Sequence, residues 1–219
     1  MRKVIAATFL SLDGVMQAPG TPEEDPTGGF AYGGWIVNYW DELLGQVMGE
    51  AMAAPFDLLL GRKTYDIFAA HWPYIEGDAI AEKFNAATKY VATSSTQPLV
   101  WNQALALHDP AADVARLKQE DGPALLIQGS GQLVQTLLAH NLIDRFTVLV
   151  FPLLLGRGKR FFGSGTVPAA LTLVDSKVSS TGVTMATYVR EGDIRTGSFA
   201  PREPSERERA RREKMKREG

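Results

Sequence analysis

Short apolar runs without polar alternation are the feature of this sequence that most restricts its fold. "DLLLG" at 57–61 and "ALLIQ" at 124–128 are two such runs. A strand with one face in water alternates apolar and polar residues, whereas a strand covered on both faces is apolar throughout. Segments with helical periodicity separate these runs, an order typical of parallel sheets flanked by helices. We therefore expect an α/β protein with three layers around a mainly parallel, twisted sheet.

The expected elements alternate along most of the chain. The strands are predicted at 3–10, 57–61, 89–93, 124–128 and 145–151, and the helices at 37–53, 63–69, 111–119 and 130–140. The segment 171–190 reads instead as two strands joined by a polar turn at 179–182. Antiparallel strands are therefore expected to close one edge of the sheet. The Pro- and Gly-rich segment 16–34 is predicted to be a long loop, of the kind that is either functional or disordered.

Composition excludes several classes of function. The chain has 219 residues and a net charge of −2, which gives it no general attraction for nucleic acid or an anionic membrane. It has no cysteine, which excludes disulfides and thiolate chemistry and is consistent with a cytoplasmic protein. No apolar run reaches the roughly 18 residues of a membrane helix. The three histidines, at 71, 108 and 140, have no metal-site spacing, so no metal site is predicted.

The end of the chain has a different composition. From 202 to 219 we count eight Lys or Arg and five Glu, with Met215 as the one sizeable apolar residue. Such a segment cannot add to a core. We expect a folded domain at 1–191 and a charged tail at 192–219 that is disordered or partly helical. Ser205 and Glu208 have capping-box spacing, and the mixed charges favour a solvated extension over a nucleic-acid contact.

Polar residues and glycines follow three of the predicted strands. "GSG" at 129–131 joins a strand to a helix, "GRKT" at 61–64 does the same, and "TSS" at 93–95 follows a third strand. Backbone N–H groups at a helix N-terminus bind anions, and glycine lets the backbone approach them closely. Parallel strands place all three junctions at one edge of the sheet. A ligand with several phosphates, such as a dinucleotide, could span them.

Two familiar motifs are not completed at the Gly-Ser-Gly turn. The third glycine of a dinucleotide-binding fingerprint would stand at position 134, which is Val134. A serine-hydrolase elbow would need glycine at position 132, which is Gln132. The turn therefore matches neither a standard Rossmann protein nor a serine hydrolase.

The motifs "GRKTYDIF", "VATSSTQPL", "GSGQLVQTLL" and "VFPLLLGRGKRFF", with "SLDGVMQAPG" near the start, stand in a recognisable order. Over residues 2–191 the sequence resembles the dihydrofolate reductase-like superfamily. It is most similar to the bacterial branch related to the C-terminal reductase domain of RibD, the bifunctional enzyme of riboflavin biosynthesis. The resemblance implies a dihydrofolate reductase-like fold, NADPH as cofactor and a possible homodimer, to which the apolar segment 146–155 could contribute.

By position, the resemblance implies three groups of cofactor-binding residues. They are Gly61, Arg62, Lys63 and Thr64 at the pyrophosphate, Thr93, Ser94 and Ser95 near the adenosine 2′-phosphate, and Gly129, Ser130, Gly131, Gln132 and Leu133 at the pyrophosphate and ribose. True dihydrofolate reductases carry Gly-Gly where this chain has Gly129 and Ser130. This departure points to the riboflavin-type branch.

Candidates for the catalytic and substrate-binding residues are fewer. The candidate catalytic acids, which would supply or relay a proton, are Asp41 and Asp13. Asp41 is the acid on the helix that carries the substrate-binding acid of dihydrofolate reductases, although its spacing to Gly61 is longer than usual there, and Asp13 follows the first strand. A helix-capping role for Asp41 and a turn role for Asp13 are the alternatives. Asp66 is a third possible acid. Trp35 and Trp40 could stack on a flat heterocycle, and Lys159 could bind a substrate phosphate.

These observations predict an NADPH-dependent reductase of a pteridine- or pyrimidine-like heterocycle. Its nearest analogue is the 5-amino-6-(5-phosphoribosylamino)uracil reductase of riboflavin biosynthesis. No His/Cys zinc motif of a deaminase is present. Two alternatives stay open, namely a dihydrofolate reductase and a non-catalytic nucleotide-binding protein of the same fold.

Overall fold

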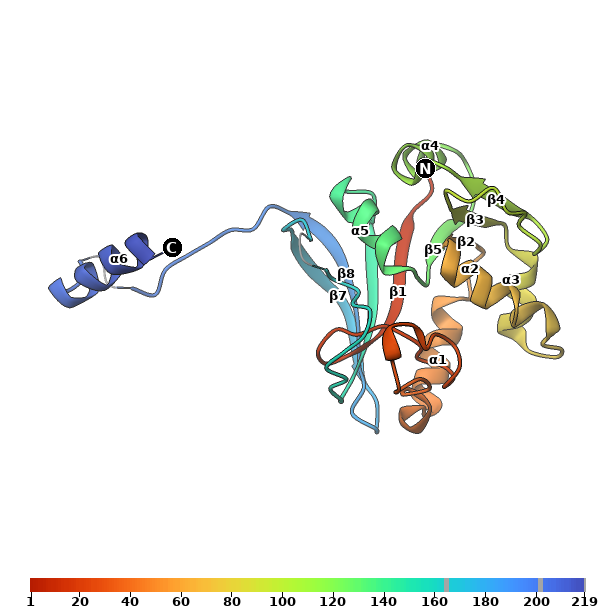
Figure 1. Ribbon diagram of the computed structural model, residues 1–219, viewed down its shortest axis with the longest axis horizontal. Helices are drawn as coiled ribbons and strands as arrows, with labels where there is room; N and C mark the ends of the chain where they lie inside the picture. Colours follow the sequence, from red (N-terminus) through yellow and green to blue (C-terminus); the bar gives the residue numbers. More distant parts are fainter. Residues whose placement is uncertain (164–165, 201–202, 219) are drawn as a thin grey trace.

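The computed structural model describes residues 1–163, 166–200 and 203–218. Its centre is an eight-stranded sheet in the order β4-β3-β2-β5-β1-β6-β8-β7, with helices on both faces (Figure 1). All pairs from β4 to β6 are parallel, and β8 and β7 add antiparallel strands at one edge. The predicted three-layer fold with antiparallel closing strands is confirmed.

The strands match most of the predicted ranges. They are β1 (Val4–Ser11), β2 (Phe56–Gly61), β3 (Lys89–Ala92), β4 (Ala104–Leu107), β5 (Ala124–Ile127), β6 (Arg145–Phe151), β7 (Ala170–Val178) and β8 (Thr184–Gly192). The α-helices are α1 (Glu42–Ala51), α2 (Arg62–Ala69), α3 (Ala79–Ala86), α4 (Pro110–Gln119), α5 (Gly131–Ala139) and α6 (Glu206–Glu218). Short 3-10 turns lie at Thr27–Gly29, Val37–Tyr39 and Trp72–Tyr74.

Two apolar cores lie on opposite faces of the sheet. On one face, Leu58 and Leu60 of β2 pack with residues of α1, α2 and α3. On the other, Leu59 packs with residues of α4 and α5. Successive β2 side chains therefore enter different cores, because strand side chains alternate between the faces. This double burial explains why the strand sequence is apolar throughout.

Three elements differ from the prediction. The helix expected at 37–53 is divided into a 3-10 turn and α1, because Trp40 is extended and Asp41 begins α1 as its N-cap residue. The strand β4 and the helix α3 were not predicted. β4 is an edge strand of four residues, Ala-Leu-Ala-Leu, which contains none of the β-branched or aromatic residues typical of strands.

The tail leaves the sheet after β8. Figure 1 shows α6 standing apart from the rest of the chain, and none of its residues is buried. Ser205 Oγ accepts a hydrogen bond from Glu208 N at 3.3 Å, as the capping pattern predicts. Residues 201–202 and 219 of the predicted tail lie outside the described residues. Among the described helices, none is both long and apolar enough to cross a membrane.

Candidate active site

A cleft of about 1630 Å³ opens where β5 ends. β5 pairs with β1 only as far as Ala6 and with β2 only as far as Leu58, so both neighbours continue beyond it. The backbone that would have extended β5 turns instead through Gly129–Gly131 into α5. The cleft thus lies at the carboxyl end of parallel strands, where open α/β sheets bind ligands.

Two helices begin at this cleft without a side-chain cap. The N-cap residue of α2 is Gly61, which has no side chain to cap the helix, and that of α5 is Ser130, whose side chain accepts no backbone hydrogen bond. By contrast, aspartates cap α1, α3 and α4 through hydrogen bonds from backbone N–H groups. Uncapped N–H groups and the positive end of the helix dipole favour an anionic ligand.

The two helix starts are packed tightly together. Gly61 N donates to Gly129 O at 3.3 Å. A Cβ on Gly61 would lie 2.1 Å from Ser130 Oγ, and one on Gly129 would lie 2.7 Å from Thr64 Oγ1. Gly129 also has φ of 150°, a conformation that favours glycine, and its peptide bond to Ser130 is cis. Both glycines therefore let the two turns approach each other.

The loop after β3 forms a third wall. Thr93 Oγ1 accepts a hydrogen bond from Ser95 N at 3.0 Å, and Thr93 O lies 3.0 Å from His108 Nδ1. Arg62 reaches this loop from the start of α2 and donates to Gln97 O at 3.2 Å and to Asp66 Oδ1 at 2.8 Å. A guanidinium thus lies between the first turn of α2 and the hydroxyl-rich loop.

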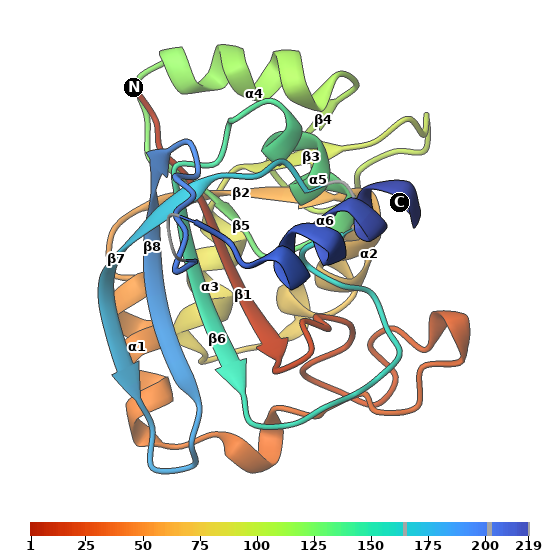
Figure 2. The same cartoon turned by 90° about the vertical axis from the view of Figure 1, so that its left-hand side faces the viewer.

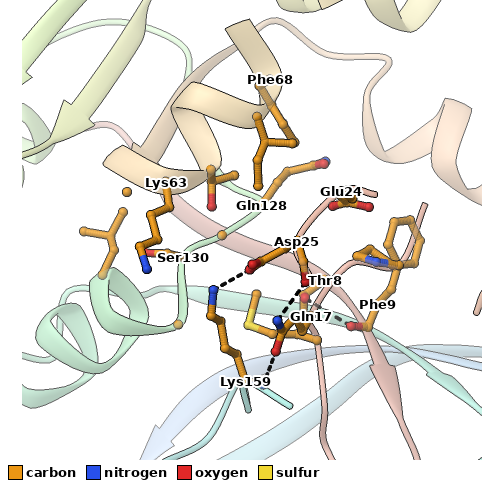
Figure 3. Close-up of a pocket in the computed structure, with 18 of the residues that line it drawn as sticks. Thr8, Phe9, Gln17, Glu24, Asp25, Lys63, Phe68, Gln128, Ser130 and Lys159 are labelled. Carbon is orange, nitrogen blue, oxygen red and sulfur yellow. Dashed lines mark hydrogen bonds and ion pairs between the residues drawn. The ribbon is translucent and has the colours of Figure 1, made fainter. Parts of the chain in front are cut away.

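The structure brings together every residue predicted to bind the cofactor. Gly61, Arg62, Lys63, Thr64, Thr93, Ser94, Ser95, Gly129, Ser130, Gly131, Gln132 and Leu133 all line the cleft. Lys63 is exposed, and within the described residues it has no ion pair. It extends toward the cleft beside Ser130 in Figure 3.

The other end of the cleft is more apolar. Phe9 of β1, Met48 of α1 and Phe68 of α2 line it, together with further apolar residues of the same elements. Figure 3 shows Phe9 and Glu24 on one side of the view and Lys63 and Ser130 on the other. One end of the cleft is therefore formed by two helix starts and hydroxyl side chains, and the other by aromatic and aliphatic side chains beside the loop that carries Glu24 (Figure 3).

Three carboxylates line the cleft among the described residues, and the sequence analysis named none of them. They are Glu23, Glu24 and Asp25, all in the loop between β1 and α1. Asp25 forms an ion pair with Lys159 and also accepts hydrogen bonds from Thr27. The Lys159 and Thr27 contacts lower the pKa of Asp25 against the opposing effect of burial. Lys159, predicted to bind a substrate phosphate, lines the cleft with its ammonium paired to Asp25.

Gln17 holds this loop in place. Its side chain is buried, and its Nε2 donates to the carbonyl oxygens of Asp25 and Thr27 at 2.9 Å each. Its Oε1 accepts from Lys159 N at 3.0 Å (Figure 3). The loop predicted to be functional or disordered is therefore ordered here by contacts to the segment after β6.

Asp41 and Asp13 are placed outside the lining of the cleft. Asp41 accepts from Leu44 N at 3.0 Å as the cap of α1, and from Ser180 N at 3.0 Å in the turn between β7 and β8. These donors lower the pKa of Asp41. Its geometry is that of the capping alternative, so a catalytic role has no support from its position.

Asp13 is an anchor between two loops. It accepts hydrogen bonds from Ser11 Oγ at 2.6 Å, Leu155 N at 3.1 Å and Gly156 N at 2.9 Å. The Ser11 hydroxyl and these N–H groups lower the pKa of Asp13 to about 2, although burial opposes them. Such a carboxylate stays ionised at neutral pH, which suits the turn role better than proton donation.

The two tryptophans predicted at the substrate are also outside the lining. Trp35 is buried, packs edge-on against Phe151 at 5.3 Å and donates to Gln17 O at 2.8 Å. Trp40 is 43% exposed and packs edge-on against Phe9 at 6.2 Å. Both support residues of the cleft rather than face it. Asp66 is paired with Arg62 and is not part of the lining either.

Comparison with known proteins agrees with this geometry. The model of the RibD C-terminal domain family matches residues 2–185. The chain belongs to the RibD C-terminal domain family. This match supports the reductase class and the riboflavin-type branch that the motifs indicate.

One curated relative of this RibD C-terminal domain protein is YyaP of Bacillus subtilis, an uncharacterised protein. It is 31% identical over 137 residues, which cover 60% of this chain and 72% of the relative.

Two solved structures show the fold. A diaminohydroxyphosphoribosylaminopyrimidine deaminase/5-amino-6-(5-phosphoribosylamino)uracil reductase of Thermotoga maritima has a TM-score of 0.55 at 16% identity, covering 86% of this chain and 56% of its own. Dihydrofolate reductase from Enterococcus faecalis, complexed with NADP(H), has a TM-score of 0.53 at 15% identity, covering 86% of this chain and 96% of its own. The dihydrofolate reductase-like fold is therefore confirmed.

Proposed function

We propose that this protein is an NADPH-dependent reductase of a pteridine- or pyrimidine-like heterocycle. The observation that carries the proposal is the convergence of the uncapped N-termini of α2 and α5 on one cleft. The nearest analogue is the 5-amino-6-(5-phosphoribosylamino)uracil reductase activity named for the Thermotoga maritima protein.

The residues present fit NADPH. Gly61 and Gly129 keep side chains out of the space where the two helix starts meet, so backbone N–H groups can reach a pyrophosphate. Ser94 and Ser95 line the cleft in the loop that Arg62 contacts through Gln97 O, and hydroxyls with a guanidinium suit the 2′-phosphate that distinguishes NADPH from NADH. When bound, the reduced nicotinamide supplies the two electrons of the reduction.

The chain's own residues would orient the substrate and exclude water. Phe9 and Phe68, with the apolar side of α1, suit a planar ring. The cleft-lining residues of α1 are Val47, Met48 and Ala51, followed by the C-cap residue Met52, and all four are apolar. A dihydrofolate reductase needs its substrate acid on this helix, so this face of α1 disfavours that alternative.

A homodimer is a further part of the proposal. The apolar segment 146–155 buries Phe146, Val148, Leu149 and Phe151 inside the chain, so these side chains are unavailable to a second copy. The edge strand β7 instead exposes Leu171, Leu173, Val174 and Val178. Exposed apolar residues on an edge strand favour self-association, which light scattering on the purified protein would detect.

Calorimetry with NADPH and NADH tests the proposed function. The wild type is expected to bind NADPH with micromolar affinity and NADH more weakly. A Ser94→Ala/Ser95→Ala double variant should lose affinity for NADPH and keep its affinity for NADH, while Ser176→Ala on β7 should match the wild type. Absence of binding to both cofactors would overturn the proposal. With binding established, loss of the reduced-nicotinamide absorbance in the presence of pteridines and aminouracils identifies the acceptor.

A further inference from the structure

The acids of the cleft come from one loop. Among the described residues of the lining, the carboxylates are Glu23, Glu24 and Asp25. No acid of β1, α1 or α2 is part of the lining. Among the described residues, a carboxylate that contacts the ring of a heterocycle bound in this cleft must therefore come from this loop.

Glu24 differs from its two neighbours in what its oxygens do. Glu23 is exposed, and Asp25 is engaged by Lys159 and Thr27. Glu24 is half-buried, and its Oε2 accepts from Gly20 N at 2.7 Å and from Thr21 N at 3.4 Å. Within the described residues, the side-chain hydrogen bonds of Glu24 all involve Oε2. Its Oε1 is therefore available to a donor from a ligand.

The backbone contacts fix the direction of this carboxylate. Because Oε2 is held by two N–H groups of its own loop, the side chain loses little further freedom when a ligand binds Oε1. Asp25, next in sequence, ties the loop to Lys159, and Gln17 ties it to the segment after β6. Figure 3 shows Glu24 near Asp25, on the side of the cleft away from Lys63 and Ser130.

The electrostatic surroundings favour a donor ligand. Burial raises the pKa of Glu24 and Asp25 adds to this, while the N–H groups of Gly20 and Thr21 and the nearby His71 act in the opposite direction. A carboxylate whose charge is poorly solvated gains most from a cationic or N–H-rich partner. His71 also lines the cleft and is the basic group that acts on Glu24.

We propose that Glu24 is the substrate-binding carboxylate of this protein, and that it accepts hydrogen bonds from the N–H edge of a planar heterocycle. The inference rests on the proposed function and deepens it. It selects substrates with neighbouring N–H donors, such as an amino group beside a ring N–H, over rings that present only carbonyl oxygens. Phe9 and Phe68 would supply the apolar walls of the same subsite.

Binding without cofactor tests this assignment. The probes are 2,4-diaminopteridine, which presents N–H donors, and 2,4-dioxopteridine, whose corresponding positions carry oxygens. Calorimetry on the full chain should show that Glu24→Gln weakens 2,4-diaminopteridine binding by at least about tenfold, the loss expected for one charge-assisted hydrogen bond. The affinity for 2,4-dioxopteridine should change less on the same substitution. The control Glu42→Gln removes an exposed acid of α1 outside the cleft and should leave both affinities within about twofold.

The cofactor separates the two proposals. If the wild type binds NADPH and the Glu24→Gln variant keeps the wild-type affinity for 2,4-diaminopteridine, the role of Glu24 is overturned and the reductase proposal stands. Wild type that binds neither NADPH nor the pteridine would overturn both. If the Gln variant does not fold, Glu24→Asp keeps the charge and withdraws it by one methylene. That variant should still bind 2,4-diaminopteridine more than about threefold more weakly than wild type, and unchanged affinity would contradict the assignment.

Discussion

Gly61 and Ser130 approach so closely that a Cβ added to Gly61 would lie 2.1 Å from Ser130 Oγ. The two residues are the N-cap positions of α2 and α5. The convergence of two helix N-termini on one cleft therefore depends on the missing side chain. It also links a steric property of the fold to the proposed binding of a pyrophosphate.

Gly61→Ala is expected to weaken NADPH binding by at least about tenfold, because the methyl group must push the starts of α2 and α5 apart. Gly49→Ala is the matched control, since a Cβ on Gly49 of α1 meets nothing within 4 Å. That variant should keep its NADPH affinity and gain roughly 0.5–1 kcal/mol of stability, the usual difference between Gly and Ala inside a helix. Calorimetry and urea unfolding measure the two effects. Equal NADPH affinity of Gly61→Ala and wild type would contradict the steric account.

A buried ion pair fastens the start of the chain. Arg2 is 4% exposed, pairs with Asp57 of β2 and donates from Nε to Pro123 O at 2.8 Å. Arg2→Met leaves the Asp57 charge without its cation, although Thr88 N still donates to it at 3.0 Å. Breaking such a pair on one side is expected to lower the free energy of unfolding by about 3–5 kcal/mol.

The exposed pair of Lys177 and Glu50 provides the comparison, at 3.1 Å. Lys177→Met should change the free energy of unfolding by less than about 1 kcal/mol, because water already solvates both charges. Urea unfolding at neutral pH measures both variants. Similar losses for Arg2→Met and Lys177→Met would show that the ion pair of Arg2 contributes no more than a surface pair.

The end of the cleft that we propose binds the cofactor could be predicted from the sequence because its signals are local. A buried strand, a glycine and a helix start are each visible in short segments such as 57–64 and 124–133. Parallel pairing then requires that these segments share one edge of the sheet. The prediction needed no knowledge of contacts between distant residues.

The substrate end could not be predicted in the same way. Glu24 lies in a loop without periodicity, and the loop's position depends on the buried Gln17, which binds Lys159 N across a separation of 142 residues. The helix start at Asp41 was visible, but a capping aspartate and a substrate-binding aspartate have the same local sequence. The contact with Ser180, 139 residues away, is what favours the cap.

Asp13 gives a prediction for acid conditions. Its pKa is lowered from the ordinary 3.8 to about 2, first by the Ser11 hydroxyl. Because this pKa is lower in the folded state, ionised Asp13 stabilises the folded state at every pH above the pKa of the unfolded chain. This stabilisation is lost as the pH falls from about 4 toward 2. Asp13→Asn should therefore unfold at lower urea concentration than wild type at pH 6. The difference between the two unfolding midpoints should be smaller at pH 3. Asp175→Asn, at an exposed position of β7, controls for net charge. A gap that stays constant with pH would contradict the anchoring role.

Lys89 gives the opposite prediction at alkaline pH. It is 0% exposed, donates to Asn85 O at 2.8 Å and lies 4.4 Å from the Trp101 ring centroid. Burial lowers its pKa from 10.5 to about 8, although Asp57 acts in the opposite direction.

The folded state therefore binds this proton less well than the unfolded state, so stability rises with pH between about 8 and about 10.5. Over that interval, the free energy of unfolding of wild type should rise by on the order of 3 kcal/mol relative to that of Lys89→Met, since one pKa unit corresponds to about 1.4 kcal/mol. Urea unfolding of both proteins at a series of pH values measures the gain, with Lys177→Met subtracting the effect of removing one exposed lysine. A difference between wild type and Lys89→Met that does not change with pH would show that Lys89 is charged in the folded state throughout, held by its hydrogen bonds and by Asp57.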